Sequence, residues 1–135
     1  MANALFPLGK QAFESAGINL TSDSIKVALL PTSATYSSTA QYESSYSAAF
    51  IGTPQVITGI TVTNGVVNGA GVTFTAVASG STVGALLIYK DTGTPTTSPL
   101  IAWIDTGSTG AISLTTNGGN ITITWDTGSN AIFAL

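Results

Sequence analysis

The amino-acid sequence predicts a mainly β protein, an antiparallel β-sandwich or barrel of about seven to nine short strands with one N-terminal α-helix. Three observations lead to this fold class. Apolar and polar residues alternate with a period of two in several short segments, as in half-buried strands. Turn residues, mainly Asn-Gly and Asp-Thr-Gly, separate those segments. The 135 residues are 44% hydrophobic and 7% charged, unlike a disordered chain, and they are expected to form a single domain, residues 1–135.

Residues 1–17 are expected to form the N-terminal helix. Asn3 can cap it, Pro7 would fall in its first turn, where a missing N–H costs little, and Gly17 is a natural stop. The helix is expected to pack on one face of the sandwich or to plug one end. Its apolar face would carry Leu5, Leu8, Ala12 and Ala16.

Residues 18–135 are expected to form the β-sandwich. Two apolar runs, 85–89 and 100–104, do not alternate, which indicates strands that are covered on both faces. The turn signals between strands include Asn64-Gly65 and Asn117-Gly118-Gly119. The expected strands lie at residues 25–29, 60–63, 72–76, 85–89, 100–104, 121–125 and 132–135.

Residues 31–50 form a long segment that is rich in Ser, Thr and Tyr and shows no strand pattern. Irregular stretches of this length are uncommon in compact domains and are often binding loops. Tyr42, Tyr46 and Phe50 recur every four residues, the spacing of a short helix. Two interpretations are open: the aromatic stripe packs on the sandwich as core, or it forms an adaptable Tyr/Ser contact surface.

The composition excludes several classes of function. A net charge of −3 with three Lys cannot build a nucleic-acid surface. The absence of His and Cys removes Ser-His-Asp and Cys-His triads, most zinc sites and disulfides. The longest apolar run is far too short to cross a bilayer, and residues 1–10 do not resemble a secretory signal. We expect no nucleic-acid partner, no membrane partner, no cofactor and no metal; Asp126, Ser129 and Asn130 match a calcium loop only weakly.

The triplet Asp-Thr-Gly occurs at 91–93, 105–107 and 126–128, and it is also the catalytic triplet of aspartic proteases. Those enzymes need two carboxylates that face each other across a water and share a proton. No triplet here is followed by the flap hairpin and the apolar-apolar-Gly strand that a small dimeric protease requires. Each triplet instead follows an apolar strand, where Asp accepts a hydrogen bond from the N–H two residues on and Gly takes positive φ. The sequence therefore predicts turns, no catalytic residues and no enzyme.

The scarcity of charge favours a subunit of a large assembly, because interface cores are depleted of charged groups and low net charge weakens repulsion between copies. Two features keep alternatives open. Residues 132–135 are expected to be the last strand of the chain's own sheet, but they could extend a neighbour's sheet. Trp103 and Trp125 are expected in the core, but exposed aromatics could stack on sugars in an adhesion module.

Most of the chain resembles a family of small tailed-bacteriophage virion proteins. The resemblance rests on residues 4–30 (ALFPLGKQAFESAGINLTSDSIKVALL), 71–93 (GVTFTAVASGSTVGALLIYKDTG), 98–107 (SPLIAWIDTG) and 115–135 (TTNGGNITITWDTGSNAIFAL). The sequence differs from the family's usual pattern at Thr116, where Pro is common, and at Ala134, where Lys is common.

The resemblance implies a structural role on the capsid surface of a virion. It is similar to that of capsid decoration (cement) proteins, which bind the outer shell and clamp neighbouring capsomers. The expected partners are the major capsid protein of the same phage and further copies of this chain. A tail or tail-fibre component and a carbohydrate-binding adhesion module are the alternatives. The candidate assembly contacts are Leu5, Phe6, Tyr36, Tyr42, Tyr46, Phe133 and Leu135.

Overall fold

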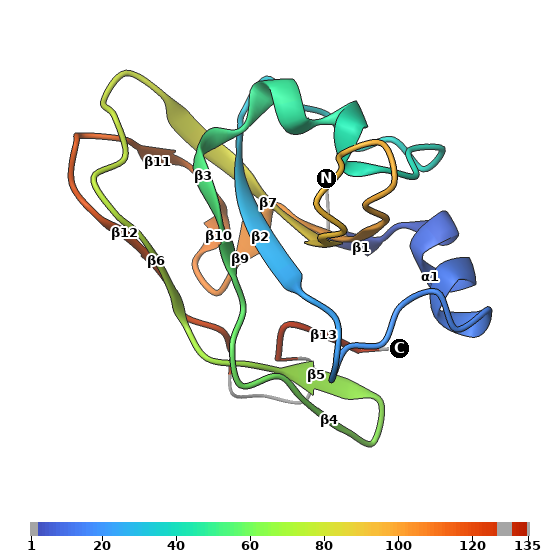
Figure 1. Ribbon diagram of the computed structural model, residues 1–135. Helices are drawn as coiled ribbons and strands as arrows, with labels where there is room; N and C mark the ends of the chain where they lie inside the picture. The colour runs from blue at the N-terminus through green and yellow to red at the C-terminus, as the bar shows by residue number, and fades with distance from the viewer. Residues whose placement is uncertain (1–2, 127–130, 135) are drawn as a thin grey trace.

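A computed structural model describes residues 3–126 and 131–134, and these residues confirm the mainly β class. They form thirteen strands, all paired antiparallel, one α-helix and two short 3-10 helices. Eight of the described strands contain at least three residues, and five contain two. The arrangement of open sheets is that of a β-sandwich (Figure 1).

A six-stranded sheet forms the centre of the molecule, and its core strands are buried on both faces. Residues 85–89 are all buried, which confirms the interpretation of their unbroken apolar run. The strand order is β1-β8-β7-β2-β3, and β11 pairs with the beginning of β7. The strands are β1 (Ala4–Leu5), β2 (Ile25–Pro31), β3 (Ile51–Val56), β7 (Thr82–Lys90), β8 (Leu100–Ile104) and β11 (Leu114–Thr115).

Smaller sheets cover one face of the central sheet and enclose the larger hydrophobic core (Figure 1). One contains β13 (Phe133–Ala134), β5 (Val66–Asn68) and β4 (Thr61–Thr63). Another pairs β12 (Ile121–Ile123) with β6 (Val72–Phe74), and β9 (Thr106–Gly107) forms a hairpin with β10 (Gly110–Ala111). Because β13 pairs with β5, the C-terminal strand belongs to the chain's own sheet, as expected.

The segment between β2 and β3 covers the opposite face of the central sheet. It contains two 3-10 helices, Glu43–Ser45 and Ser47–Ala49, in place of the short helix suggested by the aromatic spacing. Tyr46 is 8% exposed and packs in a second hydrophobic cluster with residues of β2, β7 and β8. The interpretation of the aromatic stripe as core is therefore confirmed at Tyr46, and Tyr36 and Phe50 pack against the same cluster.

The N-terminal segment differs from the expected helix of residues 1–17. The helix, α1, spans Pro7–Glu14, and the preceding residues form β1 at the edge of the central sheet. Asn3 does not cap the helix; its side-chain oxygen accepts hydrogen bonds from the N–H groups of Asp105 (2.8 Å) and Thr106 (2.9 Å). Pairing with β8 satisfies the backbone before Pro7, so the helix begins at the proline, as its restricted φ favours.

Candidate functional site

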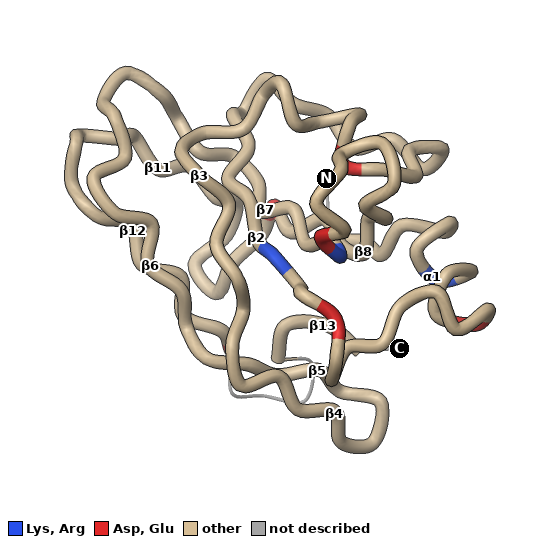
Figure 2. The backbone as a smooth tube through the Cα atoms, in the orientation of Figure 1, with Lys and Arg blue, Asp and Glu red and all other residues tan. Residues whose placement is uncertain are grey.

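Charged residues are concentrated at one end of the central sheet, where β2 begins and β7 ends (Figure 2). Five of the nine charged residues lie there, and we call them the charged cluster: Asp23, Lys26, Glu43, Lys90 and Asp91. By contrast, residues 51–89 and 106–125 contain no charged side chain, and we call these the uncharged segments. They include β3 to β6, most of β7 and β9 to β12, so much of the sandwich surface carries only neutral groups.

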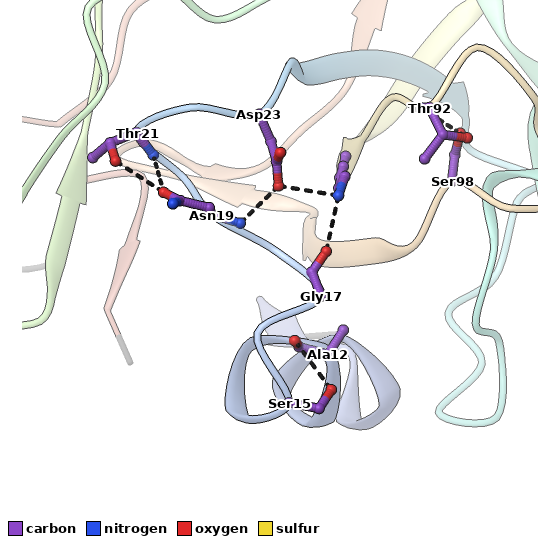
Figure 3. A network of polar contacts seen from close by, with 9 residues as sticks. Ala12, Ser15, Gly17, Asn19, Thr21, Asp23, Thr92 and Ser98 are labelled. Atoms are coloured by element: carbon purple, nitrogen blue, oxygen red, sulfur yellow. Dashed lines mark hydrogen bonds and ion pairs between the residues drawn. The ribbon is translucent and has the colours of Figure 1, made fainter.

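Two ion pairs form within the charged cluster. Lys26 Nζ lies 2.7 Å from Asp91 Oδ2, and Lys90 Nζ lies 3.2 Å from Asp23 Oδ2. Lys90 also donates a hydrogen bond to the carbonyl of Gly17 (2.9 Å), and Asp23 accepts one from the Asn19 N–H (2.7 Å; Figure 3). These bonds fasten the connection after α1 to the end of β7.

Both paired carboxylates have a lowered pKa. The Asn19 N–H is the main cause at Asp23, with Lys90 adding to it, although partial burial opposes the shift. Lys26 is the main cause at Asp91, with the Gly93 N–H adding to it. Groups of this kind stabilise the folded state above their unfolded pKa, and the stabilisation is lost as the pH falls through the folded pKa.

The Asp-Thr-Gly triplets do not all form the predicted turn. At the first, the Gly93 N–H donates to Asp91 Oδ1 (2.9 Å) and Gly93 has φ +87°, which confirms the turn. At the second, the turn prediction is wrong: Gly107 lies in β9, and the Asp105 carboxylate accepts hydrogen bonds from Trp103 Nε1 (3.0 Å) and Thr106 Oγ1 (3.1 Å). The Asp105 carboxylate thus binds the indole N–H that precedes the triplet, and Gly107 does not have the positive φ of the predicted turn. Residues 127 and 128 of the third triplet lie outside the described residues.

Asp91 and Asp105 do not form the facing carboxylate pair of an aspartic protease within the chain. They follow β7 and β8, which are antiparallel, so they lie at opposite ends of that strand pair. Leu86 is the partner of Ile104 in this pairing, so Asp105 lies opposite Ala85, about six residues or roughly 20 Å from Asp91 along β7. Within residues 3–126 and 131–134, no group of three or more Asp, Glu, His or Cys side chains could hold a metal. Ser129 and Asn130 of the calcium candidate lie outside the described residues.

Glu43 is a buried carboxylate that the sequence interpretation missed. It is 8% exposed, its backbone N–H donates to the Ser98 carbonyl (2.8 Å), and its carboxylate lies beside the Ser98 and Tyr89 hydroxyls. Burial is the main cause of a raised pKa at Glu43, and the nearby Asp91 carboxylate adds to it, whereas Lys26 opposes it. The Tyr89 pKa is also raised, first by burial and then by the Glu43 and Asp91 charges. The signal in the sequence was a single acidic residue inside an otherwise uncharged aromatic segment.

Replacing Glu43 by glutamine is expected to stabilise the protein by about 1 kcal/mol at pH 7. Because the folded-state pKa lies above the unfolded value, ionisation opposes folding, and stability falls as the pH rises from about 4.5 through the folded pKa. The gain should therefore disappear below pH 4.5. Urea unfolding between pH 3.5 and about 8 measures the difference in stability between the Glu43→Gln variant and the wild type. Glu14→Gln, an exposed change on α1, is the matched control and should shift stability by less than about 0.5 kcal/mol. A Glu43→Gln variant that is less stable than the wild type at pH 7 would contradict the interpretation.

An apolar groove of about 960 Å³ opens on the side of the sandwich where β1 and β8 face β12 and β13. The N-terminal and C-terminal candidate contacts Leu5 and Phe133 both line this groove, although they are far apart in the sequence. Leu5 is half-buried, and Phe133 is 8% exposed. The groove is also lined by Ile104, Ile112, Ile121, Ile123 and Trp125.

The other candidate contacts lie mainly inside the molecule. Phe6 is fully buried, and Tyr46 accepts a hydrogen bond from the Ser37 N–H (3.0 Å) and donates one to the Thr35 carbonyl (3.1 Å). The half-buried Tyr36 donates to the Leu5 carbonyl at 3.3 Å. These side chains join β1 to the covering segment, and Phe6 and Tyr46 are buried there. Their part in assembly stays a prediction. Tyr42 is half-buried beside Pro99, and Leu135 lies outside the described residues.

Both tryptophans are in the core, as expected. Trp103 is 3% exposed, and Trp125 is 8% exposed with its Nε1 donating to the Ala70 carbonyl at 3.0 Å. Neither ring is available for stacking on a sugar in this structure. Among the residues that the structure describes, no helix is long and apolar enough to span a membrane.

The fold and the charge distribution together define an antiparallel β-sandwich in which five of the nine charged residues gather at one end of the central sheet. The chain matches no known family model, no curated protein and no solved structure.

Proposed function

We propose that this chain is a non-enzymatic structural protein of a tailed-bacteriophage virion, and that it acts as a capsid decoration protein. In this role it binds the outer shell, bridges neighbouring capsomers and contacts the major capsid protein and copies of itself. The observation that carries the proposal is the separation of charge: the uncharged segments form a large part of the surface, and the charged cluster is engaged internally.

A neutral surface of this kind suits repeated protein contacts. Burying a charged group at an interface costs free energy unless it is paired, whereas hydroxyl and small apolar groups lose less when water is removed. The outer face of the β6–β12 pair illustrates this chemistry, because Thr73 and Thr122 are exposed cross-strand partners with their hydroxyls 3.4 Å apart. The resemblance to phage virion proteins is the second support for the proposal.

The proposal is tested with shells of the corresponding phage that lack this protein. The purified chain should co-sediment with them, saturate at a fixed ratio to the capsid protein and raise the temperature at which they rupture. Failure of the wild-type chain to bind would overturn the decoration role and direct the search to tails, fibres and glycans.

A paired substitution tests whether the neutral β6–β12 face makes the contact. Thr73→Lys combined with Thr122→Glu keeps the net charge and can form a cross-strand ion pair, so the fold should tolerate it. We expect it to weaken shell binding at least tenfold, on the order of 1.4 kcal/mol, because the new charges lose water on contact. Ser22→Glu, at an exposed position next to the charged cluster, is the control and should bind as the wild type does. Unchanged binding by the paired variant would exclude this face.

A further inference from the structure

The outer strand of the three-stranded sheet, β4, has a backbone edge directed away from its partner β5. The loop between them is Asn64-Gly65, with φ +51° and +79°, the two positive values of a type I′ hairpin. A two-residue hairpin of this type closes on a hydrogen-bonded pair, here Thr63 and Val66. Bonded and non-bonded pairs alternate along an antiparallel ladder, so the N–H and C=O of Val62 point outward. Val62 is 47% exposed, so this edge is open to solvent.

Apart from its short length of three residues, this edge lacks the features that usually prevent strands from pairing between molecules. Such features are charged side chains, proline, bulges and very short strands. The edge strand β3 contains Pro54, a positive φ at Gly52 and a register shift against β2. At the opposite edge, β1 has two residues, and the Leu5 carbonyl already accepts a hydrogen bond from Tyr36. By contrast, β4 is Thr-Val-Thr, regular in its register with β5 and exposed throughout.

The sequence of β4 is complementary to itself. If two copies met antiparallel across a twofold axis through Val62, Val62 would lie opposite Val62, and Thr61 opposite Thr63. The outward N–H and C=O of each Val62 would then bond those of the other. Cross-strand pairs of β-branched residues each contribute roughly 0.2–1 kcal/mol, and an isologous contact uses the same residues on both copies.

Electrostatics also favours a second copy as the partner. The strand lies within residues 51–89, which carry no charge, so the meeting edges bring no like charges together. The net charge of −3 arises elsewhere in the chain, at the charged cluster, α1, Asp105 and Asp126.

We infer that β4 is a self-association edge, which joins two three-stranded sheets into one continuous six-stranded sheet. This inference stands on the strand edge and does not depend on the virion role. A three-residue strand buries much less than the roughly 1,200 Å² of a stable interface, so the contact between free copies is weak. It becomes effective at about millimolar local concentration, the condition created when copies are held side by side.

Amide hydrogen exchange on the wild-type chain tests the inference, because pairing protects an amide that otherwise faces water. The Val62 amide should exchange at least about threefold more slowly at 1 mM protein than at 20 µM. Thr61 and Thr63 amides, which already bond β5, should change little. Sedimentation at the same two concentrations should show a shift towards dimer.

Matched variants separate pairing at β4 from general association. Thr61→Lys with Thr63→Lys places like charges opposite each other across the twofold axis and should abolish the concentration dependence at Val62. Thr73→Lys with Thr75→Lys adds the same charge to exposed threonines of the same spacing in and beside β6 and should retain it. An identical Val62 exchange rate at both concentrations would overturn the inference. So would equal protection in the Thr61→Lys, Thr63→Lys variant. Neither result would bear on shell binding.

Discussion

Replacing Gly9 by alanine is expected to destabilise the protein by about 3 kcal/mol or more, because the added methyl group would overlap the backbone of β8. Gly9 lies on the buried side of α1, and a Cβ atom at this position would come within 2.2 Å of the Leu100 carbonyl oxygen in β8. The obstructing atom belongs to the backbone of a central strand, so it cannot rotate away. Helix propensity alone predicts that the alanine variant would be more stable, because alanine is favoured over glycine by about 1 kcal/mol within a helix.

Gly107→Ala is the matched control for this prediction. Its added Cβ would have no neighbour closer than 4.0 Å, and Gly107 does not have positive φ. We expect a change of less than about 0.5 kcal/mol there. Urea unfolding of both variants, monitored by tryptophan fluorescence, compares the losses in free energy of unfolding. A Gly9→Ala protein as stable as the control would show that α1 does not rest on β8.

The parts of the fold that the sequence predicted are those set by burial on both sides of a strand. The runs at 85–89 and 100–104 are apolar at every position, because one face meets the second layer and the other meets the covering segment. A run of this kind can be recognised in the sequence without knowing which elements cover the strand. The alternating strands were also found, although β6 and β12 end two residues earlier than expected, at Phe74 and Ile123.

The N-terminal segment shows what local patterns cannot reveal. Ala4–Leu5 matches the apolar spacing of a helix, but these residues pair with Ala102 and Trp103, nearly one hundred positions along the chain. That contact is decided by tertiary structure. The strand β3 was not predicted from the sequence for a different reason. It contains Gly52 and Pro54, which are typical of turns, but an edge strand tolerates both.

The prediction of the contact residues was limited by the chemistry of tyrosine. Tyrosine carries a large apolar ring and one hydroxyl, so the same side chain suits a core or a contact surface. The sequence therefore could not separate the two interpretations of the aromatic stripe. The structure decides it for Tyr46, whose hydroxyl finds both of its partners within residues 35–37. The free edge of β4 could not be predicted from the sequence either, because a strand is known to lie at an edge only once its neighbours in the sheet are known.

Trp103→Ala is expected to destabilise the protein by about 3–5 kcal/mol, the cost of removing a large buried aromatic side chain. Trp103 is 3% exposed, and its ring centroid lies 5.6 Å from that of Tyr46 and 6.1 Å from that of Tyr36. Both tyrosines come from the segment that covers the central sheet. Loss of the indole would therefore weaken the attachment of that segment as well as leave a cavity. Urea unfolding measures the free energy, and near-ultraviolet circular dichroism reports the packing of the two tyrosines.

Trp103→Phe separates the ring from its polar atom. Phenylalanine keeps much of the aromatic packing but removes the Nε1 hydrogen bond to Asp105, so the expected cost is about 1–2 kcal/mol. The two variants also separate the core role of Trp103 from the sugar-stacking role that an adhesion module would require. A glycan-binding tryptophan would lose binding on substitution by alanine while the stability stayed within about 0.5 kcal/mol of the wild type. If Trp103 is a core residue, the protein loses stability in proportion to the ring atoms removed. Trp103→Ala should therefore cost more free energy of unfolding than Trp103→Phe, as expected from the packing of Trp103 with Tyr36 and Tyr46.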